Sequence, residues 1–258
     1  MSPRLGALLG VAALLAGCTP DGIAAPPSTS VRASTASAVV STDSVPPSQW
    51  RAVLVAGDNN SPAFDNGVEA LRDKLVARGV RDIRVLTSDP GANPGVPAAT
   101  AANVSNALRL PGGEACLAFV TSHGDETGFV LRQARGTVAP ASLASALDAG
   151  CGSRPTVVVL SACHSGVFLT PAMRRPNRIV LTAAAADRVS FGCGSGDQYN
   201  YFDQCLLQQF DGASTWNQLA ASTRSCVERL EQRMGIGRSS RPQVFVGAAV
   251  TDLKVPGR

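Results

Sequence analysis

Residues 156–166 read TVVVLSACHSG, and this stretch decides how the chain is organised. Its β-branched and aliphatic beginning predicts a buried strand over 156–162, and the strand ends where Cys163 and His164 stand side by side. Such a pair could be two metal ligands, part of a redox group, a nucleophile with its base, or a product of core packing. The segments around it decide among these interpretations.

Apolar segments of strand type and of helix type alternate along the chain. Continuous apolar runs predict strands, and apolar residues spaced three and four apart predict helices. We expect strands over 51–57, 82–88, 115–125, 156–162, 178–185 and 242–249, and helices over 64–79, 100–113, 140–152, 201–210 and 214–235. This alternation predicts an α/β fold with a mostly parallel sheet of about six strands, covered by helices on both faces.

A second strand of this series also ends in reactive side chains. The segment LAFVTS (117–122) runs into His123, Gly124 and Asp125. The helix over 140–152 separates this strand from the one that ends at Cys163, so the two strands can be direct neighbours in a strand–helix–strand unit. Catalytic groups of open α/β sheets gather at the carboxyl ends of strands, and neighbouring strands lie about 4.8 Å apart. His123 and Cys163 are therefore expected within side-chain reach of each other.

Of the two histidines in the chain, His123 is the better partner for Cys163. Successive side chains of an extended segment point to opposite faces, so His164 is poorly placed to act as the base of its neighbour. We interpret His164 as a residue of the pocket rim that contacts substrate, or as a capping residue. Taken alone, Cys163 is well explained as a core cysteine and His123 as an ordinary strand-end histidine. Their occurrence at two matched strand ends favours a chemical role.

This pair of side chains suits nucleophilic catalysis. A thiolate attacks, an imidazolium stabilises it, and the same imidazole later protonates a leaving amine. Gly124 has no side chain that would block a substrate, and its backbone N–H, with that of Cys163, could bind the oxyanion of a tetrahedral intermediate. The sequence has no Cys-x-x-Cys, no phosphate-binding loop and no Gly-x-Ser-x-Gly, so zinc, redox and serine-hydrolase sites lack their usual motifs.

The beginning of the chain resembles an export signal. Arg4 precedes the apolar run LGALLGVAALLAG (5–17), which is too short to cross a membrane comfortably. LAGC (15–18) resembles the lipobox of bacterial lipoproteins, in which the cysteine is lipidated. We therefore predict a lipoprotein signal peptide over 1–17, a lipid on Cys18 that binds the bilayer, and a disordered tether rich in Pro, Ser, Thr and Ala over 18–49. Ordinary secretion with a buried Cys18 is the alternative.

The rest of the chain, 50–258, is expected to form a single domain. A chain of 258 residues with 45% hydrophobic composition can build a full core. The net charge is only +4 and there is no run of Lys and Arg, so we predict no nucleic-acid partner. By resemblance to lipoprotein sorting, Thr19 after the lipidated cysteine favours the periplasmic face of the outer membrane.

The two strand-end motifs, TSHGD (121–125) and SACHSG (161–166), resemble those of the legumain family, the asparaginyl endopeptidases of the caspase-like clan of cysteine peptidases. VLVAGD (53–58), LTAAAADRVSFGC (181–193) and YNYF (199–202) follow that family's order, so the resemblance covers roughly residues 50–250. It implies a caspase–hemoglobinase-like three-layer α/β/α sandwich that acts on peptides or proteins. It also implies hydrolysis through a thioester acyl-enzyme, without a metal or other cofactor.

The resemblance also implies roles for single residues. Cys163 matches the nucleophile, His123 the general base, and Ser190 lies in the segment that forms the pocket wall and contacts substrate. The family's Arg-His pair, which holds the asparagine of the substrate, has no counterpart here, and Asp65 and Asn66 stand nearest to it. The asparagine that orients the catalytic histidine is also missing, with Ala63 near its place. Asp65 could receive a basic or polar side chain of the substrate, or could serve only at a helix N-terminus.

Seven cysteines in an exported protein suggest disulfides. Cys116 and Cys151 precede the two neighbouring strands, so they could be joined at the end of the sheet opposite Cys163. A bond from Cys193 to Cys205 or Cys226 is a second possibility, because connectivity cannot be read from sequence.

We therefore predict an exported, lipid-anchored cysteine endopeptidase of the legumain-like type. A transpeptidase of the same fold, which passes the acyl group to an amine, is one alternative. A catalytically degenerate module that binds a component of the cell envelope is another.

Overall fold

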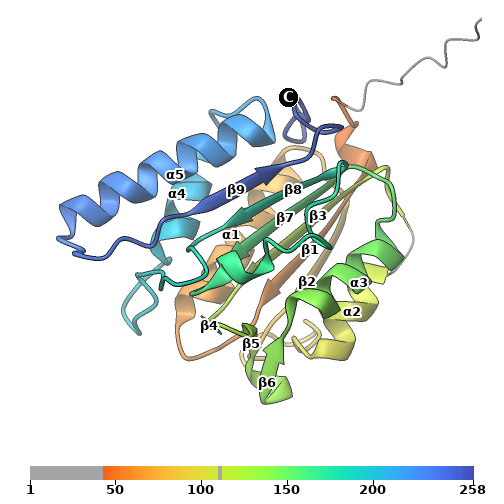
Figure 1. The fold of residues 1–258 in the computed structure, drawn as a ribbon. Helices are drawn as coiled ribbons and strands as arrows, with labels where there is room; N and C mark the ends of the chain where they lie inside the picture. Colours follow the sequence, from red (N-terminus) through yellow and green to blue (C-terminus); the bar gives the residue numbers. More distant parts are fainter. Residues whose placement is uncertain (1–42, 110–111) are drawn as a thin grey trace, which may run out of the picture. The chain divides into compact units, whose positions relative to one another are not determined.

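Six strands form the central sheet, in the order β2-β1-β3-β7-β8-β9 (Figure 1). The first five of this order pair in parallel, and β9 runs antiparallel to β8. The computed structural model describes residues 43–109 and 112–258. In chain order the strands of this sheet are β1 (Trp50–Ala56), β2 (Asp82–Leu86), β3 (Ala115–Thr121), β7 (Thr156–Ser161), β8 (Arg178–Thr182) and β9 (Gln243–Val246).

Five α-helices cover the sheet on both faces, which makes three layers (Figure 1). One face packs against α1 (Pro62–Ala77), α4 (Tyr201–Phe210) and α5 (Trp216–Arg233). The other face packs against α2 (Ala101–Arg109) and α3 (Pro140–Gly150). β1, β3, β7 and β8 are buried along their whole length, as continuous apolar strands between two helix layers require. The structure therefore has the α/β sandwich and the mostly parallel sheet of six strands that the sequence predicts.

Local signals in the sequence set where the helices begin. Ser61 caps α1 by accepting a hydrogen bond from the backbone N–H of Ala63, and α1 starts at a proline. α3 also starts at a proline, and Thr215 caps α5. On the α1 side of the sheet, Trp50 and Trp216 lie with their ring centroids 6.0 Å apart, and both side chains are fully buried. The two aromatic rings join the first strand to the last helix.

A small second sheet differs from the sequence expectation. After β3 the chain forms β4 (Gly124–Asp125), β5 (Gly128–Leu131) and β6 (Gly136–Val138), three antiparallel strands in a row (Figure 1). The predicted strand over 115–125 is thus two strands with His123 between them. Strands this short are below the length at which alternation of apolar and polar residues is informative. Three short 3-10 segments complete the fold: Pro47–Gln49, Arg132–Ala134 and Ser165–Phe168.

The folded part starts earlier than the predicted boundary at residue 50. The backbone N–H of Lys254 donates to the carbonyl of Asp43 at 2.7 Å, and the Trp50 indole N–H donates to the carbonyl of Val45 at 3.2 Å. The predicted tether over 18–49 is therefore wrong for residues 43–49, which pack on the domain. The predicted signal peptide over 1–17, Cys18 and the rest of the tether lie outside the described residues. Within the described ranges, no helix has both the length and the apolar composition to cross a membrane.

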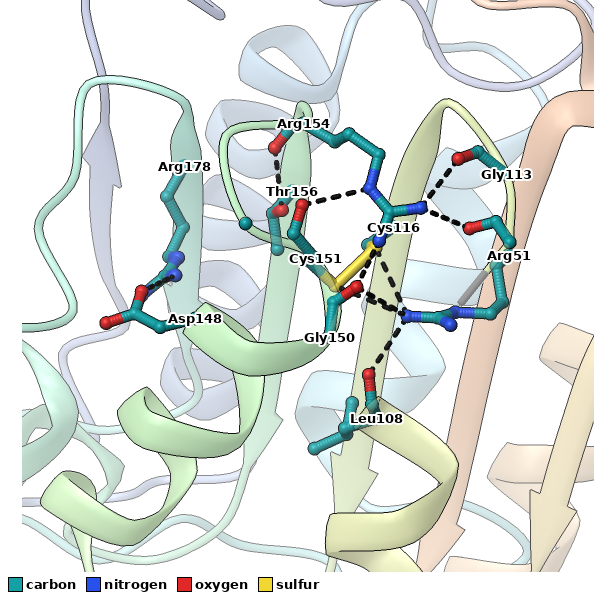
Figure 2. The surroundings of a disulfide bond; sticks show 12 residues. Arg51, Leu108, Gly113, Cys116, Asp148, Gly150, Cys151, Arg154, Thr156 and Arg178 are labelled. Atoms are coloured by element: carbon teal, nitrogen blue, oxygen red, sulfur yellow. Dashed lines mark hydrogen bonds and ion pairs between the residues drawn. A yellow bond between two sulfur atoms is a disulfide. The ribbon is translucent and has the colours of Figure 1, made fainter. Parts of the chain in front are cut away.

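Two disulfides join elements of the domain. Cys116 and Cys151 are bonded at the amino-terminal end of β3 and β7, the pairing that their positions before these strands suggested (Figure 2). The buried guanidinium of Arg51 lies against this bond and donates to the carbonyls of Leu108 and Gly150, at 2.9 and 3.4 Å. Burial, and then the charge of Arg154, lower the pKa of Arg51.

The second disulfide joins α4 to α5 through Cys205 and Cys226. The expected bond from Cys193 to one of these cysteines is wrong, because Cys193 is free. The Cα atoms of Cys205 and Cys226 lie 5.6 Å apart where α4 packs on α5, a contact that helix periodicity alone does not specify.

Candidate active site

The carboxyl ends of β3 and β7 lie side by side at one edge of the sheet. The parallel register pairs Thr121, the last residue of β3, with Ser161, the last residue of β7. His123 and Cys163 each follow this pair by two residues, and both side chains are partly exposed. His123 is reached from the α1 side, where the ring of Phe64 meets the imidazole edge-on with centroids 5.2 Å apart. The structure thus brings the two sequence motifs to the same rim of the sheet.

The backbone of Gly124 lies directly against that of Cys163. A Cβ atom at position 124 would stand 2.4 Å from the carbonyl oxygen of Cys163 and 3.0 Å from the Cβ of Ala162. Only glycine fits here without movement of the two strand ends. Among the described residues, none accepts a hydrogen bond from the backbone N–H of Cys163, which leaves that donor available to a ligand.

Ser190 lies closer to the thiol than the sequence motif indicates. Its backbone N–H donates to Sγ of Cys163 at 3.3 Å, and its hydroxyl oxygen lies 3.6 Å from the same sulfur. The loop between β8 and α4 holds Ser190 in this place. The backbone of this loop therefore lies within hydrogen-bond distance of the Cys163 sulfur.

His164 has a left-handed backbone conformation, with φ 56° and ψ 11°. Few residues other than glycine adopt this conformation, and it occurs where the surrounding contacts impose it. Here the His164 N–H donates to the carbonyl of Arg188 at 2.7 Å, and Nδ1 donates to the carbonyl of Ala186 at 2.9 Å. The ring therefore turns toward the β8–α4 loop. It lines a pocket of about 420 Å³ between residues 187–191 and 235–238.

Cys193 is the second free cysteine of the described residues and lies near the first. Burial, and then the charges of Cys163 and Asp197, raise the pKa of the Cys193 thiol. The sequence motifs do not indicate this proximity, because Cys193 lies in an irregular loop that has no hydrophobic periodicity. Within the part of the chain that the structure describes, no group of three or more His, Cys, Asp or Glu side chains could hold a metal ion.

Asp65 is engaged with a neighbouring loop. Its carboxylate accepts a hydrogen bond of 2.7 Å from the hydroxyl of Thr87, just beyond the end of β2 and two strands away from β3. Burial raises the pKa of Asp65, against the opposing effect of this hydrogen bond. The carboxylate lies in the first turn of α1, which matches the helix-terminal interpretation of this residue.

A buried polar network lies beneath the two strand ends, and sequence reasoning missed it. The hydroxyls of Thr121 and Ser161 both bond to Asn200, which caps α4, and Thr121 also bonds to Asp203. Burial raises the pKa of Asp203 to about 7, although hydrogen bonds from Thr121, Ser161 and Asn200 act in the opposite direction. An Asn followed by an apolar helix is a recognisable cap signal, so Asn200 could have been found as a cap. Its contact with two strand ends could not.

Comparison with known proteins gives a family match and a structural match. Residues 112–233, a range that contains both motifs, match the peptidase C13 family. Among solved structures, caspase-1 from Spodoptera frugiperda is similar in fold, with 12% sequence identity and a TM-score of 0.55, over 77% of this chain and 88% of that one. No curated protein matches the chain. The family match supports the legumain-family resemblance, and the structural match shows the caspase-like fold that this resemblance implies.

Proposed function

Because the chain is a cysteine peptidase with a caspase-like fold, we propose that it cleaves peptide bonds with Cys163 as the nucleophile and His123 as the general base and acid. The observation that carries this proposal is the parallel register of β3 and β7, in which Thr121 pairs with Ser161. His123 and Cys163 stand at equivalent positions beyond that pair. The segment that matches the peptidase family includes both residues, which supports the same assignment.

The proposed reaction has two halves. The imidazole of His123 takes the thiol proton, and the Cys163 thiolate attacks the carbonyl carbon of the scissile bond. The backbone N–H groups of Gly124 and Cys163 bind the oxyanion of the tetrahedral intermediate. The imidazolium then gives its proton to the leaving amine as the C–N bond breaks, which leaves a thioester on Cys163. In the second half, His123 takes a proton from water as the water oxygen attacks the thioester carbonyl. The C–S bond then breaks, the acid product leaves, and the imidazolium returns its proton to the Cys163 sulfur.

The substrate in this proposal is a peptide or protein segment that lies along the β8–α4 loop. Ser190 is in this loop and its N–H donates to the Cys163 sulfur, so a bound backbone there would pass next to the nucleophile. The pocket beside His164 could receive one substrate side chain. Asp65 is proposed as a more distant contact, since its carboxylate is already bonded to Thr87. The absent Arg-His pair argues against asparagine as the preferred side chain.

We further propose that the chain is exported and anchored to the periplasmic face of the outer membrane through a lipid on Cys18. The support is the apolar run over 5–17 and the LAGC sequence before Cys18. Two disulfides in a domain of this size suit an oxidising compartment. Metabolic labelling with an alkyne fatty acid is expected to mark the chain, and Cys18→Ser is expected to remove the label. Equal labelling of both would contradict the anchor.

Activity against a fluorogenic peptide library tests the assignment of the nucleophile. Cys163→Ala is expected to abolish cleavage while its thermal unfolding stays that of the wild type. Cys193→Ala, which removes the other free cysteine of the described residues, is the matched control and is expected to retain cleavage. Cleavage by Cys163→Ala at the wild-type rate would refute the assignment.

Two further measurements separate the alternatives. An added amine nucleophile, with product masses measured, distinguishes hydrolysis from acyl transfer, because transfer adds the mass of the amine to the new carboxyl end. A wild-type Cys163 that reacts with no thiol-directed acyl or epoxide probe would indicate a binding module instead of an enzyme.

A further inference from the structure

Four side chains form a closed hydrogen-bond network between β3, β7 and α4; we call Thr121, Ser161, Asn200 and Asp203 the strand-end network. The Asn200 side-chain amide donates to Oγ1 of Thr121 at 3.1 Å and to Oδ2 of Asp203 at 2.6 Å. Its Oδ1 accepts from the hydroxyl of Ser161 at 3.2 Å and from the backbone N–H of Asp203 at 2.8 Å. Thr121 completes the ring by donating to Oδ2 of Asp203 at 2.6 Å.

The network is inaccessible to water and nearly saturated. Asn200 is 3% exposed, Ser161 1%, and Thr121 and Asp203 0%. An asparagine side chain offers two donors and two acceptor positions, and Asn200 uses all four. Any other rotamer of Asn200 would leave several buried groups without partners, which is energetically unfavourable. The amide is therefore held in one orientation.

The network lies where the hydrogen-bonded ladder between β3 and β7 ends, just before the proposed catalytic dyad of His123 and Cys163. The ladder between β3 and β7 ends at the Thr121–Ser161 pair, and one further backbone bond follows, from the N–H of Ser122 to the carbonyl of Ser161 at 3.0 Å. Beyond this bond, one segment continues into β4 and the other into the 3-10 segment at Ser165–Phe168. The side chain of Asn200 spans both strand ends at this point.

The same network seats α1, which carries a contact to the imidazole. A Cβ atom added at Gly67 would lie 2.9 Å from Oδ2 of Asp203, so glycine allows α1 to approach the network closely. Phe64, about one turn earlier on α1, meets the His123 ring edge-on. The position of the imidazole thus depends on the network from two directions, through β3 and through α1.

We infer that Asn200 is a positioning residue for the dyad, which sets the separation of the Cys163 and His123 side chains by linking the two strand ends beneath them. This inference rests on the proposed function. Asn200 touches neither reacting group, so its effect is on geometry. Small displacements of reacting groups reduce rates strongly, whereas they have little effect on the binding of remote parts of a substrate.

The test compares Asn200→Ser with Thr215→Ala. Serine still caps α4 but cannot reach both strand ends or donate two hydrogen bonds, so this variant loses the link and keeps the cap. Thr215→Ala removes the cap of α5, where Oγ1 accepts from Gln218 at 3.1 Å, and leaves the network intact. The readouts are kcat and KM on a cleaved library peptide, and the rate at which iodoacetamide alkylates Cys163 at pH 7, measured on the isolated Cys163 peptide by mass spectrometry.

We expect Asn200→Ser to lower kcat about tenfold or more with KM nearly unchanged. We also expect iodoacetamide to alkylate Cys163 of this variant more slowly than Cys163 of the wild type at pH 7, because the thiol loses the aligned imidazole that takes its proton. Thr215→Ala is expected to match the wild type in both. Ser161→Ala removes a single hydroxyl and carries the test if Asn200→Ser does not fold. The variant that carries both Asn200→Ser and Ser161→Ala is expected to lose no more kcat than Asn200→Ser alone, because both changes break the same link between the strand ends.

Two results would overturn the inference while the proposed function stands. One is a rate of Cys163 alkylation and a kcat of Asn200→Ser that equal those of Thr215→Ala. The other is a drop in kcat with an unchanged rate of Cys163 alkylation and additive effects in the variant that carries both Asn200→Ser and Ser161→Ala, which is the behaviour of a general structural residue. Failure of the function itself would appear separately, as cleavage by Cys163→Ala.

Discussion

Asp203 makes a quantitative prediction about stability and pH. Its carboxyl group is fully buried, and burial raises its pKa from 3.8 to about 7. The folded protein therefore holds this proton more tightly than the unfolded chain. The contribution of the protonated Asp203 carboxyl to the free energy of unfolding is fully present below pH 3.8. It is lost as the pH rises through about 7, because the folded state must then ionise a buried carboxyl group or unfold.

The size of the effect follows from the two pKa values. Each tenfold change in proton affinity corresponds to about 1.4 kcal/mol, so the change from 3.8 to about 7 corresponds to about 4 kcal/mol in total. About 3 kcal/mol of this is lost between pH 5 and pH 8. The loss is expected as a decrease in the free energy of unfolding of the wild type over that range.

Asp203→Asn removes the titrating carboxyl group and keeps the shape of the side chain. The amide oxygen can accept from Thr121 and Asn200, as Oδ2 of Asp203 does, and the amide nitrogen takes the place of Oδ1, which has no partner among the described residues. Urea unfolding, followed by the fluorescence of buried Trp50 and Trp216, gives the free energy of each protein at each pH. The variant is expected to gain about 3 kcal/mol on the wild type between pH 5 and pH 8.

The comparison is insensitive to the other titrating groups, since they change equally in both proteins and cancel in the difference. A difference between variant and wild type that stays constant to within about 0.5 kcal/mol from pH 5 to pH 8 would refute the reasoning. It would mean that Asp203 titrates in the folded protein near its ordinary range.

Two other perturbations test the disulfide and the backbone contact that support the site. Removing the disulfide by the double change Cys116→Ala and Cys151→Ala is expected to lower the free energy of unfolding by about 4 kcal/mol, from the closure of a 35-residue loop, while peptide cleavage at 25 °C persists. An unfolding free energy within about 1 kcal/mol of the wild type would contradict this. Gly124→Ala is expected to reduce cleavage about 100-fold, because its Cβ meets the Cys163 carbonyl at 2.4 Å. Gly196→Ala, where a Cβ meets nothing within 4 Å, is the control, and equal activity of the two variants would count against the backbone packing described here.

Much of the fold was predictable because the spacing of apolar residues distinguishes its longer strands from its helices. The predicted strands 51–57 and 156–162 contain the unbroken apolar stretches 52–56 and 157–160, as strands between two helix layers favour, and the structure has strands at Trp50–Ala56 and Thr156–Ser161. The antiparallel direction of β9 has no local signal, because the sequence of one strand does not show whether it runs parallel or antiparallel to its neighbour. The short strands β4, β5 and β6 were missed for lack of length.

The sequence alone determined the order of the elements, the covered parallel sheet and the two strand ends at which His123 and Cys163 stand, because these depend on local periodicity and on the rule that parallel strands end at one edge. Only the tertiary structure decided that Cys226, and not Cys193, is the partner of Cys205, and that Asn200 links the two strand ends. These contacts join residues that no local pattern relates. They depend on which faces of the helices meet each other and the sheet, and that is settled by packing of the whole core.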